Sequence, residues 1–248
     1  LALDAGEIIT TYYRTTNLEI KWKEDNSPVT IADKEVNSLV VEAVKSRYTE
    51  HGVRGEEESW NPEAHSLWVC DPIDGTKAYM LEIPVAMFSI ALVEEGVPLV
   101  AVAYNPFTHE LFSAVKGNGA TLNDGKIQVS SRRWGEKSRL VKSDSETSSK
   151  YLLGSSEKVL ELAKENINVF TCPGAVFRGC NIAAGAFDGT YFYGDGAHDI
   201  AAVKLIIEEA GGKVTDISGK EQRYDQPING AILSNGLIHE KLITMLQQ

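Results

Sequence analysis

The stretch WVCDPIDGT, residues 68–76, decides the fold, because an apolar segment ends there in two aspartates, followed directly by Gly75 and Thr76. Pro72 fixes φ at about −65° and predicts a turn, and Gly75 has no Cβ, so the backbone N–H groups after Asp74 can approach an anion closely. A helix beginning near Thr76 would point its positive end at the same place. Hard carboxylate oxygens beside an anion site are typical of Mg²⁺ sites that also hold a phosphate.

A simpler alternative is that Asp71 and Asp74 only accept hydrogen bonds from nearby backbone N–H groups in an Asx-type turn. For an isolated Asp-Pro-x-Asp-Gly this alternative is favoured, so the surrounding segments decide. One of them, the acidic run GEEES at residues 55–59, comes about one loop before the apolar segment. It can return a further carboxylate to the same place, although an acidic loop by itself is usually solvated. The residue that does so can be any one of Glu56, Glu57 and Glu58.

Two more aspartates stand at the starts of expected helices. Thr30 and Asp33 fit a capping box before an apolar stripe of helical period over residues 36–44, so the structural interpretation of Asp33 is a helix cap. Asp199 falls in the first turn of a helix expected over 199–210, where an acidic residue stabilises the helix dipole. Neither aspartate requires a functional interpretation by itself.

Together, these four segments resemble the inositol monophosphatase superfamily of Mg²⁺-dependent, lithium-sensitive phosphomonoesterases, which includes bisphosphate nucleotidases and histidinol-phosphatases. The resemblance rests on VTIAD at residues 29–33, GEE at 55–57, WVCDPIDGT at 68–76, and the segment 199–212 that begins with DIAA and ends with EAGG. It spans nearly the whole chain. It implies an α+β or α/β fold with layers in the order α-β-α-β-α, and a phosphatase that hydrolyses a small phosphate monoester.

The resemblance also implies the roles of individual residues. One Mg²⁺ would be held by Glu56, Asp71 and the backbone carbonyl of Ile73, and a second by Asp71, Asp74 and Asp199. Two or three ions are implied, with Mn²⁺ as a substitute and Ca²⁺ or Li⁺ as inhibitors. Asp33 and Thr76 would form a catalytic pair that orients the attacking water, and the backbone N–H groups of Gly75 and Thr76 would bind the phosphate.

The substrate is less well defined by the sequence. Relatives that hydrolyse inositol phosphates carry a glutamate seven residues before the last metal-binding aspartate, where this chain has Phe192, and Asp195 could supply a substitute carboxylate. Lys77 fits the D-P-x-D-G-T-K segment of bisphosphate nucleotidases, so a 3′(2′),5′-bisphosphate nucleotidase and a histidinol-phosphatase are alternatives. Arg178 is a candidate for a second anionic group, but a surface arginine at the end of a helix is the simpler interpretation. An inactive metal-binding scaffold is the alternative that is not an enzyme.

Composition excludes some classes of protein. The chain has 248 residues and a formal charge of −11, which argues against binding a nucleic-acid backbone. No apolar run is long enough to span a membrane and no signal peptide is visible, so we expect a cytoplasmic protein. The three cysteines show no CxxC spacing, and a pair between Cys172 and Cys180 stays open. The family resemblance implies a homodimer.

The order of expected elements divides the chain into an α+β half, residues 1–135, which carries most metal ligands, and an α/β half, residues 136–248, which contributes the last ligand and substrate contacts. Closely spaced strands in the first half predict antiparallel hairpins. Alternating helices and strands in the second half predict another sheet covered by helices. The expected strands of the first half are 66–71, 85–93, 98–104 and 111–115. In the second half we expect helices at 155–165, 178–187, 199–210 and 238–247, and strands at 168–172, 189–193, 213–216 and 230–234. The polar interval near residues 124–150, where the two halves meet, is expected to form a connecting strand and loop.

Overall fold

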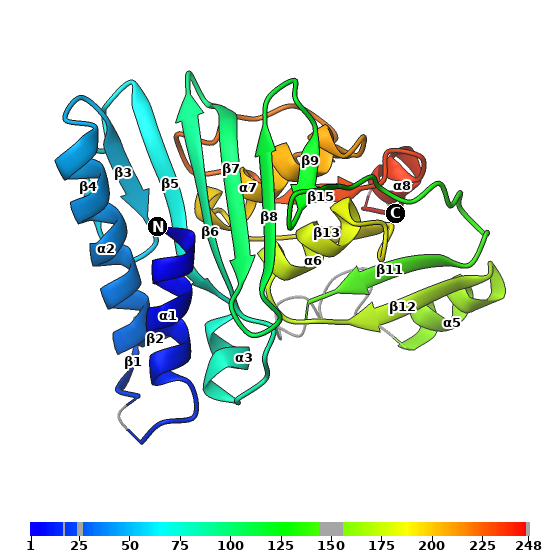
Figure 1. Cartoon of the computed structure of the whole chain (residues 1–248). Helices are drawn as coiled ribbons and strands as arrows, with labels where there is room; N and C mark the ends of the chain where they lie inside the picture. The colour runs from blue at the N-terminus through cyan, green and yellow to red at the C-terminus, as the bar shows by residue number, and fades with distance from the viewer. Residues whose placement is uncertain (17, 24–26, 144–155, 247–248) are drawn as a thin grey trace.

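Two β-sheets alternate with three layers of helices in the chain (Figure 1). The computed structural model describes residues 1–16, 18–23, 27–143 and 156–246. Residues 144–150 of the polar interval expected near 124–150 therefore lie outside the described residues, and the described part of the interval contains a strand at Ser138–Lys142.

The first sheet has eight strands in the order β10-β9-β8-β7-β6-β5-β3-β4. Neighbouring strands from β5 to β10 are antiparallel, as their short spacing in the sequence predicts, whereas β3 and β5 are parallel. The strands are β3 (Gly52–Gly55), β4 (Ser59–Trp60), β5 (Ser66–Asp74), β6 (Met87–Glu94), β7 (Val97–Asn105), β8 (Glu110–Val115), β9 (Ala120–Leu122) and β10 (Gly125–Lys126). A separate small hairpin is formed by β1 (Ile20–Trp22) and β2 (Pro28–Thr30).

The second sheet has five strands in the order β12-β11-β13-β15-β14. Strand β11 is parallel to both of its neighbours, and the remaining pairs are antiparallel. The strands are β11 (Ser138–Lys142), β12 (Ile167–Thr171), β13 (Gly189–Phe192), β14 (Lys213–Thr215) and β15 (Ala231–Ser234). A sheet in the second half is therefore confirmed.

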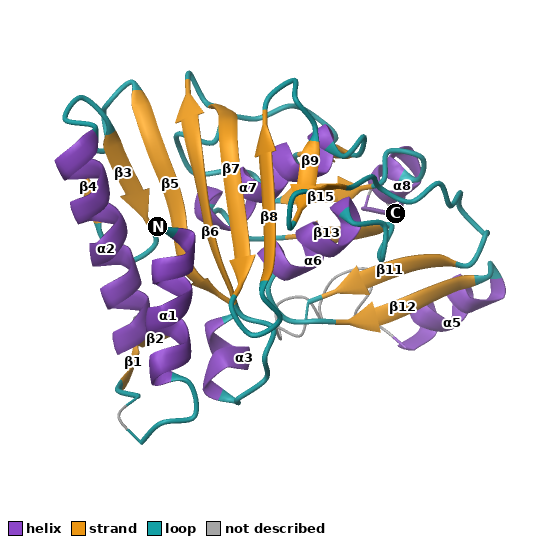
Figure 2. Cartoon of the chain, viewed as in Figure 1, coloured by secondary structure: helices purple, strands orange, loops and turns teal. Residues whose placement is uncertain are grey.

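Helices cover both sheets and fill the space between them (Figure 2). The first layer is α1 (Ala2–Tyr12) with α2 (Ile31–Arg47), the middle layer is α6 (Ala175–Ala183) with α7 (Ala197–Glu209), and the outer layer on the second sheet is α5 (Ser156–Lys164) with α8 (His239–Leu246). The short helix α3 (Thr76–Met80) follows β5 directly. Three clusters of buried apolar side chains lie between successive layers, so the expected α-β-α-β-α order is confirmed.

Some expectations differ from the structure in detail. The strand that contains Asp71 does not end in a turn at Pro72 but continues to Asp74. Helix α6 begins three residues before the expected 178–187 and ends at Ala183, followed by a turn in which Gly185 has φ +77°. Cys172 and Cys180 do not form the disulfide that the sequence leaves open. Helices α6 and α7 pack against strands of both sheets, and the division of the chain at residue 135 stays a prediction.

None of the helices in the described ranges has the length and apolar character that a membrane span requires.

The buried His239 links the outer helix α8 to the second sheet and predicts a pH-dependent stability. Its ring nitrogens lie 2.8 Å from Ser234 Oγ and 2.9 Å from Thr215 Oγ1, and burial lowers its pKa from 6.5 to about 4. Between pH 4 and pH 6.5 the imidazole is protonated in the unfolded chain but neutral in the folded protein. The contribution of His239 to the free energy of unfolding is therefore complete above pH 6.5 and is lost as the pH falls to 4. We expect the free energy of unfolding in urea to fall by about 3 kcal/mol from pH 7 to pH 4 through this group.

Other groups also titrate in this range, so the contribution of His239 has to be isolated by comparison. The variant His239→Asn should lose this part of the pH dependence, whereas His65→Asn, at an exposed position, should keep it. Equal pH dependence in the parent protein and in His239→Asn would contradict the prediction.

Candidate functional site

The parallel pairing of β3 and β5 brings the acidic loop to the end of β5. Gly55 lies opposite Cys70, and the backbone N–H of Glu56 donates a hydrogen bond to the Cys70 carbonyl at 3.1 Å. The residue after each partner is acidic, so Glu56 and Asp71 meet at the same edge of the sheet. The sequence predicts both carboxylates, but the pairing of two parallel strands decides that they lie together.

An irregularity in β5 places Asp71 and Asp74 in one cluster. Residues three apart on a regular strand point to opposite faces, but the pairing of β5 with β6 shifts its register between these two aspartates. The N–H of Ile73 donates a hydrogen bond to Asp71 Oδ1 at 3.0 Å, as the local alternative predicts. Carboxylate oxygens of Asp71, Asp74 and Asp199 nevertheless lie within 4.8 Å of one another.

Asp74 also accepts hydrogen bonds from the beginning of α6, which the sequence analysis does not predict. The N–H groups of Ala175 and Phe177 donate to its carboxylate at 2.7 and 3.2 Å. Gly174, with φ +76°, allows this approach, because a Cβ at this position would lie 2.5 Å from Asp74 Oδ2. Pro173 and Gly174 before an apolar segment are a signal for the start of a helix, but the sequence does not identify its partner.

The cluster of Asp71, Asp74 and Asp199 concentrates negative charge. Desolvation, followed by the charges of Glu56 and the other two aspartates, raises the pKa of Asp71 well above its usual value. Desolvation, followed by the charge of Asp74, likewise raises the pKa of Asp199 well above its usual value. For Asp74, burial raises the pKa, and the Arg178 guanidinium and the N–H groups of α6 oppose this effect. A bound cation would relieve the repulsion that all three groups share.

The structure places Arg178 differently from the simplest expectation of the sequence analysis. It is not a surface residue at the end of a helix but is 3 % exposed, and it lies in the first turns of α6 beside the aspartates. One of its guanidinium N–H groups donates a hydrogen bond to the Cys172 carbonyl at 3.1 Å.

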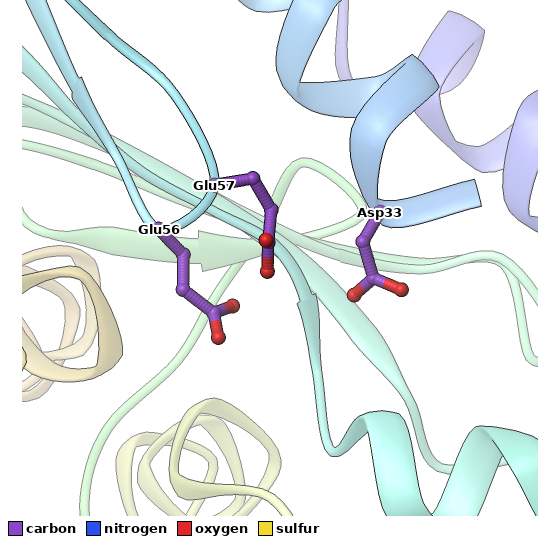
Figure 3. A group of neighbouring side chains, drawn as sticks. All are labelled: Asp33, Glu56 and Glu57. Carbon is purple, nitrogen blue, oxygen red and sulfur yellow. The ribbon is translucent and has the colours of Figure 1, made fainter. Parts of the chain in front are cut away.

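A second group of carboxylates lies beside the first. Oxygens of Asp33, Glu56 and Glu57 come within 4.8 Å of one another, and their side chains converge from the start of α2 and from the acidic loop (Figure 3). The Lys23 ammonium bonds Glu56 at 2.8 Å and Glu57 at 2.5 Å. The sequence analysis expects one of Glu56, Glu57 and Glu58 to reach the site. In the structure both Glu56 and Glu57 do so, and of the three only Glu58 is exposed.

Asp33 combines a structural contact with a contact in the site. It completes the expected capping box with Thr30, whose backbone N–H donates to Asp33 Oδ2 at 2.8 Å. Its Oδ1 lies 3.3 Å from Thr76 Oγ1, which is also 3.1 Å from the Ile73 carbonyl. Burial raises the pKa of Asp33 to about 7. The contact of Asp33 with Thr76 that the family resemblance implies is therefore present.

Two cavities meet at these carboxylates. One, of about 190 Å³, is lined by Glu56, Asp71, Ile73 and Thr76, and we call it the carboxylate cavity. The other, of about 320 Å³, is lined by Arg178 and by the consecutive aromatic residues 191–193, and we call it the aromatic cavity.

Gly75, Gly174 and Asp199 line both cavities. Asp195 is exposed and is absent from the lining of either cavity within the described ranges, so its predicted contact with substrate has no geometric support here.

Comparison with known proteins places the chain in a family. The family model described as "Inositol monophosphatase family" matches residues 1–248. An inositol monophosphatase from Mesembryanthemum crystallinum is 32% identical over 252 residues, covering 98% of this chain and 92% of that protein. A histidinol-phosphatase from Chlorobaculum parvum is 29% identical over 248 residues, covering 99% of this chain and 93% of that protein.

The fold agrees with this similarity. The crystal structure of the extragenic suppressor protein suhB from Bartonella henselae superposes with a TM-score of 0.87 at 28% identity, covering 100% of this chain and 95% of that one. The chain belongs to the inositol monophosphatase family.

Because Gly174 lies against the Asp74 carboxylate, we expect a side chain at position 174 to weaken cation binding. In Gly174→Ala the new Cβ would displace the Asp74 carboxylate, so we expect the affinity for Mn²⁺, measured by electron paramagnetic resonance, to fall by about 10-fold or more. Gly117→Ala is the matched control, because Gly117 has a similar φ of +80° with nothing within 4 Å of the added Cβ. Unchanged Mn²⁺ binding in a folded Gly174→Ala protein would contradict this account of the site.

Proposed function

We propose that the protein is a Mg²⁺-dependent phosphatase that hydrolyses a small phosphate monoester. The observation that carries the proposal is that Asp71 and Asp74 of β5 meet Asp199 of the distant helix α7, with Asp33, Glu56 and Thr76 beside them. Helix capping and turn formation explain each aspartate singly, but they do not require the aspartates to meet. Membership of a family that contains phosphatases supports the same function.

The residues at the site fit divalent cations. All donors are hard carboxylate or carbonyl oxygens, the type that Mg²⁺ prefers, and oxygens of Asp71, Asp74 and Asp199 lie within 4.8 Å of one another. Glu56, Asp71 and the Ile73 carbonyl would hold one ion, and Asp71, Asp74 and Asp199 a second. When bound, such ions activate water and neutralise charge on the phosphoryl oxygens.

The chain's own groups would position the reactants. The Thr76 hydroxyl can donate its proton to Asp33, which leaves its oxygen free to accept a hydrogen bond from a water molecule and orient it. Backbone N–H groups at Gly75 and Thr76 would bind the phosphate, and Gly75, with φ +83°, adopts a backbone that favours glycine.

The two cavities suggest on which side the leaving group lies. Asp33, Thr76 and Glu56 lie toward the carboxylate cavity, so the water would attack from there, and in-line displacement then sends the leaving alcohol to the aromatic cavity. Phe192, half-buried in that lining, cannot accept hydrogen bonds from a polyol through its side chain. Aromatic faces and the Arg178 guanidinium favour a flat or anionic leaving group, so a nucleotide phosphatase is the second candidate.

Finer features are part of the proposal. Inhibition by Li⁺, substitution by Mn²⁺ and a homodimer are implied by the family resemblance, and the cytoplasmic location is the one expected from the sequence.

Replacing Asp74 tests the catalytic assignment. Asp74→Asn keeps an oxygen that can accept from Ala175 N–H but loses the charge, so we expect a folded protein whose kcat is lower by about 10²- to 10³-fold. Asp225→Asn, which removes a carboxylate paired with the exposed Arg223, should leave kcat unchanged. Near-normal turnover by Asp74→Asn at saturating Mg²⁺ would contradict the assignment, and absence of turnover by the parent protein on every substrate would favour the inactive scaffold.

A substrate panel tests the assignment of the leaving group. We expect kcat/KM for 3′-phosphoadenosine 5′-phosphate to exceed that for inositol 1-phosphate, with histidinol phosphate as the third substrate. Phe192→Ala should lower kcat/KM for the nucleotide by about 10-fold, since stacking on an aromatic side chain contributes roughly 1–3 kcal/mol per base. Preference for inositol 1-phosphate would reject the nucleotide candidate while leaving the phosphatase proposal intact.

A further inference from the structure

Asn37 is a buried polar residue that contacts the acidic loop from helix α2. It lies four residues after Asp33, on the same face of the helix, and is 1 % exposed. Its side-chain N–H donates to the Glu58 carbonyl at 3.0 Å, and its side-chain oxygen accepts from the Glu57 N–H at 3.3 Å. One amide group thus bonds two successive residues of the loop.

Gly55 provides the space for this contact. A Cβ at this position would lie 2.2 Å from Asn37 Oδ1 and 2.5 Å from the Glu58 carbonyl oxygen. On its other side, the loop is bonded to β5 through the Glu56 N–H and the Cys70 carbonyl. The backbone of the loop is therefore fixed between α2 and the strand that ends in the aspartates.

The contacts of Asn37 differ in kind from those of Lys23. Lys23 bonds the carboxylates themselves from a hairpin, and its side chain is 27 % exposed. Asn37 bonds only backbone atoms, so it leaves the carboxylate oxygens available. Its helix is also firmly anchored, because Val36, Val40 and Val44 are buried in the apolar cluster between α2 and the first sheet.

We propose that Asn37 is a positioning residue, which holds Glu56 and Glu57 toward Asp33 and Asp71 so that their oxygens are arranged before a divalent cation binds. The inference rests on the proposed function, since it concerns the same cation site. Like charges in this cluster repel one another, and a loop without the Asn37 amide can relieve the repulsion by turning its glutamates toward solvent, where Glu58 already lies. Part of the free energy of cation binding then offsets the entropy lost when the loop becomes ordered, so the affinity for the cation is lower.

Mn²⁺ binding followed by electron paramagnetic resonance tests the proposal independently of turnover. Asn37→Leu removes both hydrogen bonds at similar volume, and we expect its affinity for Mn²⁺ to fall by about 10- to 100-fold. The Mg²⁺ concentration for half-maximal phosphatase activity should rise by a similar factor, while kcat at saturating Mg²⁺ changes little, because the cation can still order the loop.

Two further variants and a control complete the experiment. Asn37→Ser and Gly55→Ala disturb the same contact from opposite sides, and both should weaken Mn²⁺ binding in the same direction even where Asn37→Leu does not fold. Asn235→Leu is the matched control. Asn235 is 2 % exposed, and its amide bonds backbone atoms near the second sheet, so its loss should lower the melting temperature without changing the affinity for Mn²⁺.

Unchanged Mn²⁺ affinity in folded Asn37→Ser and Gly55→Ala would overturn the inference, as would an equal loss of affinity in Asn235→Leu. Either result leaves the proposed phosphatase function standing. A parent protein that binds no Mn²⁺ would overturn the proposed function and this inference with it.

Discussion

The hydrogen bonds from the first turn of α6 to the Asp74 carboxylate are the interaction on which the arrangement of the site depends. Asp74 belongs to the first sheet and α6 to the middle layer, so one buried carboxylate connects two layers that are a hundred residues apart in the chain. The positive end of the helix also offsets part of the cost of burying Asp74 beside two other aspartates. Gly174 is required there because any side chain would occupy the position of the carboxylate oxygen.

The acidic loop likewise brings negative charges together, and other groups of the chain compensate for their repulsion. Lys23 pairs with both Glu56 and Glu57 and offsets part of their charge, and the amide of Asn37 holds the loop through its backbone. Helix α2 carries both Asp33 and Asn37 on one face, and its apolar face is buried against the first sheet. Asp33, which accepts a hydrogen bond from the proposed water-orienting Thr76, and the proposed positioning residue Asn37 therefore lie on one anchored helix.

The proposed chemistry and the proposed specificity lie on opposite sides of this cluster. The carboxylate cavity contains groups that the family resemblance assigns to cation and water, while the aromatic cavity presents Phe192, its two tyrosine neighbours and Arg178. This division would let one reaction act on different alcohols, since residues of β13 can change without altering the carboxylates. Arg178 belongs to the aromatic side, because its side chain lines that cavity together with Asp74, whose pKa its charge lowers.

By itself, the sequence determined the family and, through the family resemblance, the order of layers, because residues 29–33, 55–57, 68–76 and 199–212 carry local patterns that can be recognised without knowledge of the fold. The roles of the site residues on these motifs stay predictions. The capping box of Thr30 and Asp33 is local in the same sense. Only the tertiary structure decided that both Glu56 and Glu57 face the site, that Arg178 is buried, and that Asp74 meets the start of α6. These features depend on the pairing of β3 with β5, the irregular register of β5 and the packing of α6 between two sheets. All three join residues far apart in the chain, and no local pattern encodes such contacts.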